Sequence, residues 1–142
     1  MKKRMYLLTS LGFAALLFLA GCSETINGKP IAEAQIAIFH DQMNTDSFAE
    51  IYESTHKDFK SNTSKEITDK LFSAIRRKLG RVESSETINW NVSTHNTVTT
   101  VVLVSKTKFT DGEATETFTY RVDGEQASLI GYNINSLDML VR

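Results

Sequence analysis

The sequence predicts an α+β fold, with two to three N-terminal helices packed on a four-stranded antiparallel meander. Apolar residues recur at helical spacing as far as Gly80, and beyond it the period changes to two. Asp111-Gly112 and Asp123-Gly124 then separate β-branched and aromatic segments, as the turns of hairpins do. Helices first and strands after, in a chain of 142 residues, indicate a single domain.

The first two expected helices are short amphipathic segments near the N-terminal end of this domain. Pro30 suits a first helical turn because its missing N–H would be unpaired there, and we expect a helix over 30–43. Asp46 is expected to cap a second helix over 47–54. The polar segment 56–64 is expected to be a loop.

The segment 65–79 has the clearest helical pattern in the chain. Ser64 precedes it as the expected N-cap, and Gly80 follows it where a C-terminal cap favours a left-handed residue. Basic residues fill the last turn, which the helix dipole favours. A repeat of four predicts the apolar face of this helix, Ile67, Leu71, Ile75 and Leu79, with Phe72 and Lys78 beside them.

Four strands joined by short turns are expected after this helix. The segment 87–95 alternates apolar and polar residues, and Asn96-Thr97 turns the chain into a β-branched second strand. The third and fourth strands are expected within 113–122 and 126–136. One face of the sheet is expected to pack against the helices, and the Thr-rich face to be wetter.

The second strand departs from simple alternation at Val101 and Leu103. Continuous apolar sequence is typical of a strand that is covered on both faces. We therefore identify Val101 and Leu103 as a candidate interface, covered by an oligomer partner or by strong curvature of the sheet.

The first residues have the layout of a secretory signal peptide. A basic start, Lys2 to Arg4, precedes an apolar segment shorter than the roughly 20 residues that span a bilayer. Small residues then lead to the single cysteine of the chain, and Leu19-Ala20-Gly21-Cys22 resembles the lipobox of bacterial lipoproteins.

This resemblance implies a lipid anchor on Cys22. In bacterial lipoproteins the Cys thiol receives a diacylglycerol, the signal is cut just before it, and the new N-terminus is usually acylated, typically with palmitate. The implied organisation is a signal peptide over 1–21, a lipidated tether over 22–29 and one domain over 30–142. The implied location is the bacterial cell envelope: the outer membrane if the organism has one, otherwise the outer face of the cell membrane.

A second resemblance concerns the domain. A lipobox, N-terminal helices and a meander ending in LIGYNINS resemble small bacterial lipoproteins of the nuclear-transport-factor-two-like (cystatin-like) superfamily, many of them of unknown function. The resemblance covers about 30–137 and rests on element order and on the pattern FTDGEATETFTYRVDGEQASLIGYNI. It implies a sheet bent round a helix into a cone, whose mouth binds small molecules, peptides or nothing. No catalytic motif of that superfamily matches here, so the resemblance implies no catalytic site.

Alternating aromatic residues on the strands form the candidate pocket. Such residues either line the mouth of the cone or fill the core, which is their commoner place. The four are Trp90, Phe118, Tyr120 and Tyr132.

The three histidines offer little further chemistry. His40 beside Asp41, or His56 beside Asp58, has the composition of a general base with its orienting carboxylate, or is an ordinary surface pair. His95 lies beside a turn. We expect no metal and no cofactor, because one cysteine, unsuitably spaced histidines and isolated glycines match no known binding motif.

The net charge of the mature chain limits the classes of partner that we expect. Once Lys2, Lys3 and Arg4 leave with the signal, the remaining Lys and Arg fall short of the 17 Asp and Glu, giving a net charge of −4 that weighs against nucleic acid. We therefore expect a membrane-anchored envelope lipoprotein that is not an enzyme and that binds an envelope protein, a small ligand or a second copy of itself. The alternative is a small cone-fold hydrolase or isomerase that uses a His/Asp pair.

Overall fold

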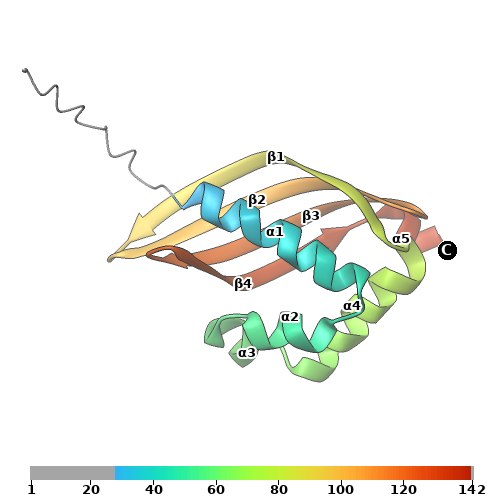
Figure 1. Ribbon diagram of the computed structural model, residues 1–142, viewed down its shortest axis with the longest axis horizontal. Coiled ribbons are helices and arrows are strands. Elements are labelled where there is room, and N and C mark those ends of the chain that lie inside the picture. Colours follow the sequence, from blue (N-terminus) through green and yellow to red (C-terminus); the bar gives the residue numbers. More distant parts are fainter. Residues whose placement is uncertain (1–27, 142) are drawn as a thin grey trace, which may run out of the picture.

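Residues 28–141 are described by the computed structural model, in which one long helix lies across a curved four-stranded sheet (Figure 1). The expected signal peptide, the lipobox and Cys22 lie outside these residues. Helix α1 (Lys29–Asn44) begins one residue before the expected start and has Pro30 in its first turn. It contacts all four strands, so it fills the concave face of the sheet.

The sheet is an antiparallel meander whose strands follow one another in sequence order, which confirms the predicted fold class. Its strands are β1 (Val82–His95), β2 (Val98–Phe109), β3 (Gly112–Asp123) and β4 (Gln126–Asn135). Asn96 and Thr97 join β1 to β2 with positive φ angles of 48° and 68°, as a tight hairpin turn requires. The other turn residues are Thr110-Asp111 and Gly124-Glu125, each one residue away from the expected Asp-Gly pair.

Four more helices complete the described chain: α2 (Phe48–Ser54), α3 (Lys57–Asn62), α4 (Lys65–Leu79) and α5 (Leu137–Val141). Helices α2 and α4 pack on α1 and on each other, α3 packs on β4, and α5 joins α4 to β3. None of the helices within residues 28–141 is both long and apolar enough to cross a lipid bilayer.

Two expectations about the short helices are wrong. Segment 56–64 is not a loop but contains α3, because the His56 ring caps it: Nδ1 accepts the N–H of Asp58 at 3.1 Å. Asp46 does not cap α2, since Ser47 occupies the N-cap position. Asp46 instead has a φ of 57° and its Oδ1 lies 3.0 Å from Arg76 Nε, which ties the α1–α2 connection to α4.

Helix α4 has the predicted bounds, but a different face is buried. The Ser64 hydroxyl accepts the N–H of Ile67, and Gly80 ends the helix with a φ of 82°. The buried residues are Thr68, Phe72, Ile75 and Leu79, whereas Ile67 and Leu71 are 59% and 36% exposed. A strict repeat of four drifts round a helix of 3.6 residues per turn, so only its last two members stay on the buried face.

The candidate interface residues Val101 and Leu103 are fully buried on the inner face of β2, in the core that α1 covers. The core of this chain therefore explains their apolar character, and they offer no surface to a partner. Val102 and Val104 lie on the opposite face of β2 and are half-buried. In a curved sheet, the outer face of a strand is partly covered by the side chains of its neighbouring strands. This partial cover accounts for the continuous apolar sequence of β2.

An aromatic cluster forms the centre of the core. The Phe39 ring of α1 lies 5.5 Å from Phe72 of α4, 5.2 Å from Phe118 of β3 and 5.0 Å from Tyr132 of β4, measured between ring centroids. One side chain thus connects the sheet to the second layer of helices. Polar groups lie directly beside this cluster.

Candidate functional site

The four candidate pocket residues do not form one pocket. Phe118 is fully buried and stacks on Tyr120, with 12° between the ring planes. Tyr132 packs against Phe118 at 5.2 Å. Trp90 is 50% exposed on β1 and lies under Lys29, whose Nζ is 5.5 Å from the ring centroid. Three of the four are therefore core residues, and Trp90 stands apart at the surface.

A buried carboxylate lies among these aromatic rings. Glu116 is 1% exposed and points inward from β3, two positions before Phe118. Its Oε1 accepts the hydroxyl of Tyr132 at 2.6 Å, and its Oε2 accepts the hydroxyl of Thr107 at 2.5 Å. His40 of α1 places Nε2 2.7 Å from the same Oε2.

Ser85 of β1 extends this network, because its Oγ lies 2.9 Å from Thr107 Oγ1. Thr107 has one hydroxyl proton, which Glu116 accepts, so Ser85 must be the donor in the bond between the two hydroxyls. We call these five residues, His40, Ser85, Thr107, Glu116 and Tyr132, the Glu116 cluster. It connects α1 to all four strands.

Stability alone does not account for such a cluster. An ionised carboxylate costs several kcal/mol to bury, and charge-assisted hydrogen bonds offset that cost only when the geometry is good. Well-packed apolar side chains of similar volume stabilise a core as well or better. A carboxylate held by three donors in an aromatic core therefore marks a candidate functional site.

Burial also keeps the tyrosines protonated. The pKa of Tyr132 is raised well above its usual value, first by burial and then by the negative charge of Glu116, to which its hydroxyl donates. The pKa of Tyr120 is raised by the same two causes, burial again being the larger. Tyr132 thus remains a hydrogen-bond donor to Glu116 throughout the physiological pH range.

The Glu116 cluster reaches a hollow of about 260 Å³ between α1 and β1. Two of its members, His40 and Ser85, line that hollow. The other lining residues are Glu33, Ile36, Ala37 and Thr87. The α1 wall therefore combines two apolar residues with Glu33 and His40, and the β1 wall presents a pair of hydroxyls. We call it the α1–β1 hollow.

Ser105 adds an unused polar group beside this hollow. It is fully buried on β2, and its hydroxyl has no hydrogen-bond partner among residues 28–141. The strand register places it between Thr87 of β1, which lines the hollow, and Glu116 of β3. A buried hydroxyl without a partner costs free energy, although Ser105 itself does not line the hollow.

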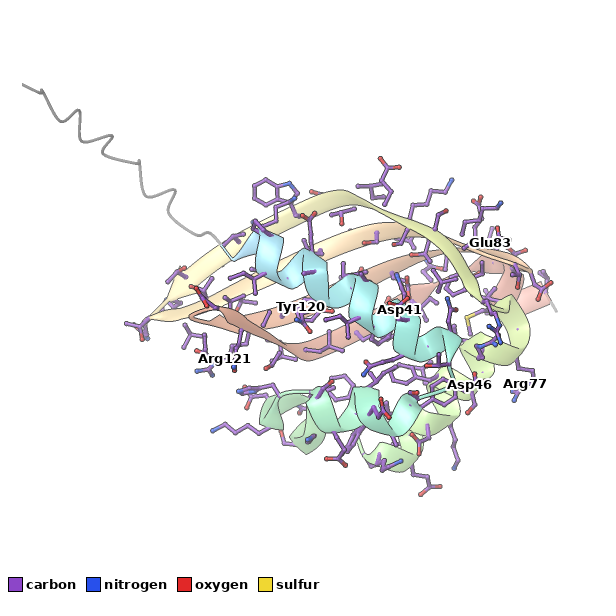
Figure 2. The ribbon with its side chains drawn as sticks, viewed as in Figure 1. Asp41, Asp46, Arg77, Glu83, Tyr120 and Arg121 are labelled. Carbon is purple, nitrogen blue, oxygen red and sulfur yellow. The ribbon has the colours of Figure 1, made fainter. Side chains whose placement is uncertain are left out.

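Other hollows in the described chain are less suited to a ligand. One of about 70 Å³ lies on the other side of α1, between its residues Gln35 and Ile38 and the inward-facing Tyr120 (Figure 2). Two larger ones, of about 340 and 390 Å³, are shallow surface features beside α5 and on α4, and neither touches the Glu116 cluster. Of these four hollows, only the α1–β1 hollow is lined by members of the Glu116 cluster.

The expected His/Asp pairs are only partly present. His40 pairs with Glu116, whereas its neighbour Asp41 is exposed on α1 (Figure 2). His56 lies 3.2 Å from Asp58 Oδ2, but its ring serves as the cap of α3. His95 is exposed at the end of β1. Within the described residues, no three His, Cys, Asp or Glu side chains gather closely enough to hold a metal ion.

A scan of protein-family models finds no match to this chain, and a search of curated proteins finds none either.

Proposed function

We propose that this chain is a lipid-anchored protein of the bacterial cell envelope, whose domain binds a small polar molecule in the α1–β1 hollow without reacting with it. The observation that carries the binding function is the meeting of a hollow with buried polar groups. The buried His40 and the exposed Ser85 line the hollow and belong to the Glu116 cluster. The unpartnered Ser105 lies opposite Thr87 in the strand register. The anchor is supported by the sequence alone, through Leu19-Ala20-Gly21-Cys22.

The direction of the hydrogen bonds indicates the class of ligand. Ser85 donates its proton to Thr107, so its lone pairs face the hollow as acceptors. His40, which also lines the hollow, uses Nε2 for its bond to the acceptor Glu116. Glu33 adds a carboxylate to the lining. The site is therefore rich in acceptors, and it suits a ligand that donates.

Charge and size restrict the ligand further. The buried carboxylate of Glu116 disfavours an anion at this site, whereas Glu33 in the lining is paired with Lys29 at 2.7 Å. A volume of about 260 Å³ lies just below the roughly 300 to 1,000 Å³ of most small-molecule sites. The proposed ligand is thus a small neutral or cationic molecule with hydroxyl or amine groups, and with an apolar edge that packs on Ile36 and Ala37.

A matched pair of variants tests the binding site. Thr87→Val removes a hydroxyl from the α1–β1 hollow, and Thr117→Val makes the same change on the half-buried outer face of β3. Full-length protein is extracted from membranes in mild detergent and its bound small molecules are measured by mass spectrometry. Thermal-shift titrations with polyols and amines accompany this measurement.

We expect wild type and Thr117→Val to bind the same small molecule, and Thr87→Val to bind it at least about tenfold more weakly, as the loss of one buried hydrogen bond predicts. Equal binding by both variants, or no binding by wild type in either assay, contradicts the proposed site. For the anchor, Cys22→Ser is expected to move the protein from the membrane to the soluble fraction.

An enzymatic function is the second candidate, and the geometry of His40 favours it. A carboxylate 2.7 Å from one ring nitrogen orients the imidazole and leaves the other nitrogen for proton transfer. The recovered ligand, incubated with wild type and with His40→Gln, separates the two functions. Recovery of unchanged ligand from both supports binding alone, whereas conversion by wild type only supports a small hydrolase or isomerase.

A further inference from the structure

The edge strand β1 exposes two large apolar side chains. Trp90 is 50% exposed and Ile88 is 57% exposed. Ile88 is the additional residue of a β-bulge, because Thr87 pairs with Ser105 and Asn89 pairs with the next residue of β2, Val104. Bulges redirect side chains and interrupt pairing at sheet edges. We call these two residues the β1 patch.

The β1 patch lies where the chain enters the domain. Lys29 is the first residue of α1, and its Nζ is 5.5 Å from the Trp90 ring centroid. Lys29 also forms an ion pair with Glu33 at 2.7 Å. Lys29 and Glu33 therefore form a balanced pair of charges beside the exposed indole ring.

Little chain separates this patch from the proposed anchor. Six residues, 23–28, lie between Cys22 and Lys29. An extended chain advances at most about 3.6 Å per residue, so Lys29 lies within about 25 Å of the anchored cysteine. Only the end of the domain that carries the β1 patch is held this close to the lipid.

We propose that the β1 patch docks on the bilayer that holds the acyl chains of Cys22, a proposal that rests on the lipid anchor proposed above. The amphipathic Trp ring is favoured at the level of lipid headgroups, where Ile88 reaches the apolar boundary beneath. Because Lys29 and Glu33 balance, docking depends on apolar burial and needs no anionic lipid. The tether makes docking intramolecular, at an effective concentration on the order of mM, so two side chains suffice.

The exposed apolar residues of α5 lie far from the start of α1 (Figure 1). Leu137, Leu140 and Val141 are exposed on α5. Helix α5 lies at the opposite end of the molecule from the start of α1 (Figure 1). Docking through the β1 patch therefore keeps α5 away from the membrane, which supplies an internal control.

Trp90 reports on its own surroundings, because it is the single tryptophan of the chain. The full-length lipidated protein is reconstituted into phosphatidylcholine vesicles, either plain or with brominated acyl chains, which quench nearby indole. The control is the double variant W90F/L140W, whose single tryptophan lies on α5. A second variant, Ile88→Asn, removes half of the patch without touching the fluorophore.

We expect the Trp90 emission to shift to shorter wavelength on reconstitution and to lose intensity in the brominated vesicles. Ile88→Asn should lose less tryptophan intensity than wild type in the brominated vesicles. W90F/L140W should show neither the wavelength shift nor the loss of intensity. Equal Trp90 emission in plain and brominated vesicles, with the protein floating with both, overturns docking but not the anchor. Protein that does not float overturns the anchor and docking together. A shift that depends on protein density without bromine quenching overturns docking in favour of contact between two copies.

Discussion

At the scale of single residues, Glu116 connects more elements than any other polar group of the candidate site. Its partners come from β2, β4 and α1, and each of them donates to the carboxylate. A carboxylate can accept all three bonds, since it has two oxygens and no proton to place. No neutral side chain of the same size can do this.

Glu116→Gln should therefore destabilise the fold. The amide keeps the shape of the side chain but turns one end into a donor, which then faces Tyr132, or His40 and Thr107. We expect the free energy of unfolding to fall by about 3 kcal/mol, as the loss of a buried charged partner does. Urea denaturation measures this change.

The matched control for this substitution is Glu113→Gln, on the same strand. Glu113 is exposed and lies 3.2 Å from Lys106 across the sheet. A surface pair of this kind contributes less than about 1 kcal/mol. If the two variants lose equal stability, the Glu116 cluster does not have the geometry described above.

Alkaline pH tests the same cluster through its tyrosines. The pKa values of Tyr132 and Tyr120 are raised in the folded state, by burial and by Glu116. Below about pH 10 both the folded and unfolded chains keep these protons, so their contribution to stability is fully present. Above about pH 10 the unfolded chain releases them first, and stability falls by up to about 1.4 kcal/mol per pH unit for each retained proton.

Denaturant titrations between pH 8 and 11 measure this fall, with the variants Tyr132→Phe and Y120F/Y132F. The first variant should show a shallower decline than wild type, and the second a shallower one still. A decline equally steep in all three proteins would exclude these tyrosines as its source.

The sequence pattern predicts only some residues of the Glu116 cluster. Counting back by two from Phe118 and Tyr120 reaches Glu116, so alternation already places an acidic residue on the apolar face of β3. The pairing of His40 with Glu116 spans 76 positions, and no local spacing predicts it, because it depends on where α1 crosses the sheet.

At the scale of elements, local signals determined which predictions were right. Helix α4 was predicted to its ends, because a Ser cap and a Gly stop mark both of them. Helix α3 was missed, since its cap is a histidine ring and it is only one and a half turns long. The buried face of α4 was misplaced because it includes Thr68, a polar residue that a search for apolar periodicity passes over.

A pair of identical substitutions checks which face of α4 is buried. Ile75→Ala removes a fully buried side chain, and Ile67→Ala removes one that is 59% exposed. We expect a loss of about 2 to 5 kcal/mol for the first and less than about 0.5 kcal/mol for the second, where the higher helix propensity of Ala offsets the lost contacts. Thermal or urea unfolding measures both. Comparable losses would mean that α4 is rotated from the orientation described.

At the scale of the whole molecule, the helices and the sheet meet at the end of α4. The N–H of Asp111 donates to the carbonyl of Leu79 at 2.9 Å, and the N–H of Thr110 donates to the carbonyl of Arg81 at 2.8 Å. The turn between β2 and β3 is thus attached to the chain on both sides of Gly80. This junction fixes α4, and through Phe72 and Phe39 it also fixes the side of α1 that carries His40.

Gly80 allows the β2–β3 turn to lie this close to the end of α4. We expect its replacement to lower the free energy of unfolding by more than backbone strain alone would. Its φ of 82° disfavours any side chain, and a Cβ would overlap the hydroxyl of Thr110 and lie 2.6 Å from Asp111 Oδ2. Thr110 cannot rotate away freely, because its hydroxyl accepts the N–H of Arg81 at 3.1 Å. Gly124 has a similar φ of 62° but no atom near its Cβ position.

Gly124→Ala measures the cost of a side chain at positive φ without crowding, about 1 to 2 kcal/mol. Gly80→Ala should exceed it by about 1 to 3 kcal/mol, from crowding and from a ψ of −145° that side chains rarely adopt at positive φ. Urea denaturation of the two variants gives the difference directly. Because the junction positions α1, Gly80→Ala should also weaken ligand binding in the α1–β1 hollow, while Gly124→Ala leaves it unchanged. Equal stability losses in the two variants would show that the β2–β3 turn does not hold α4 in place.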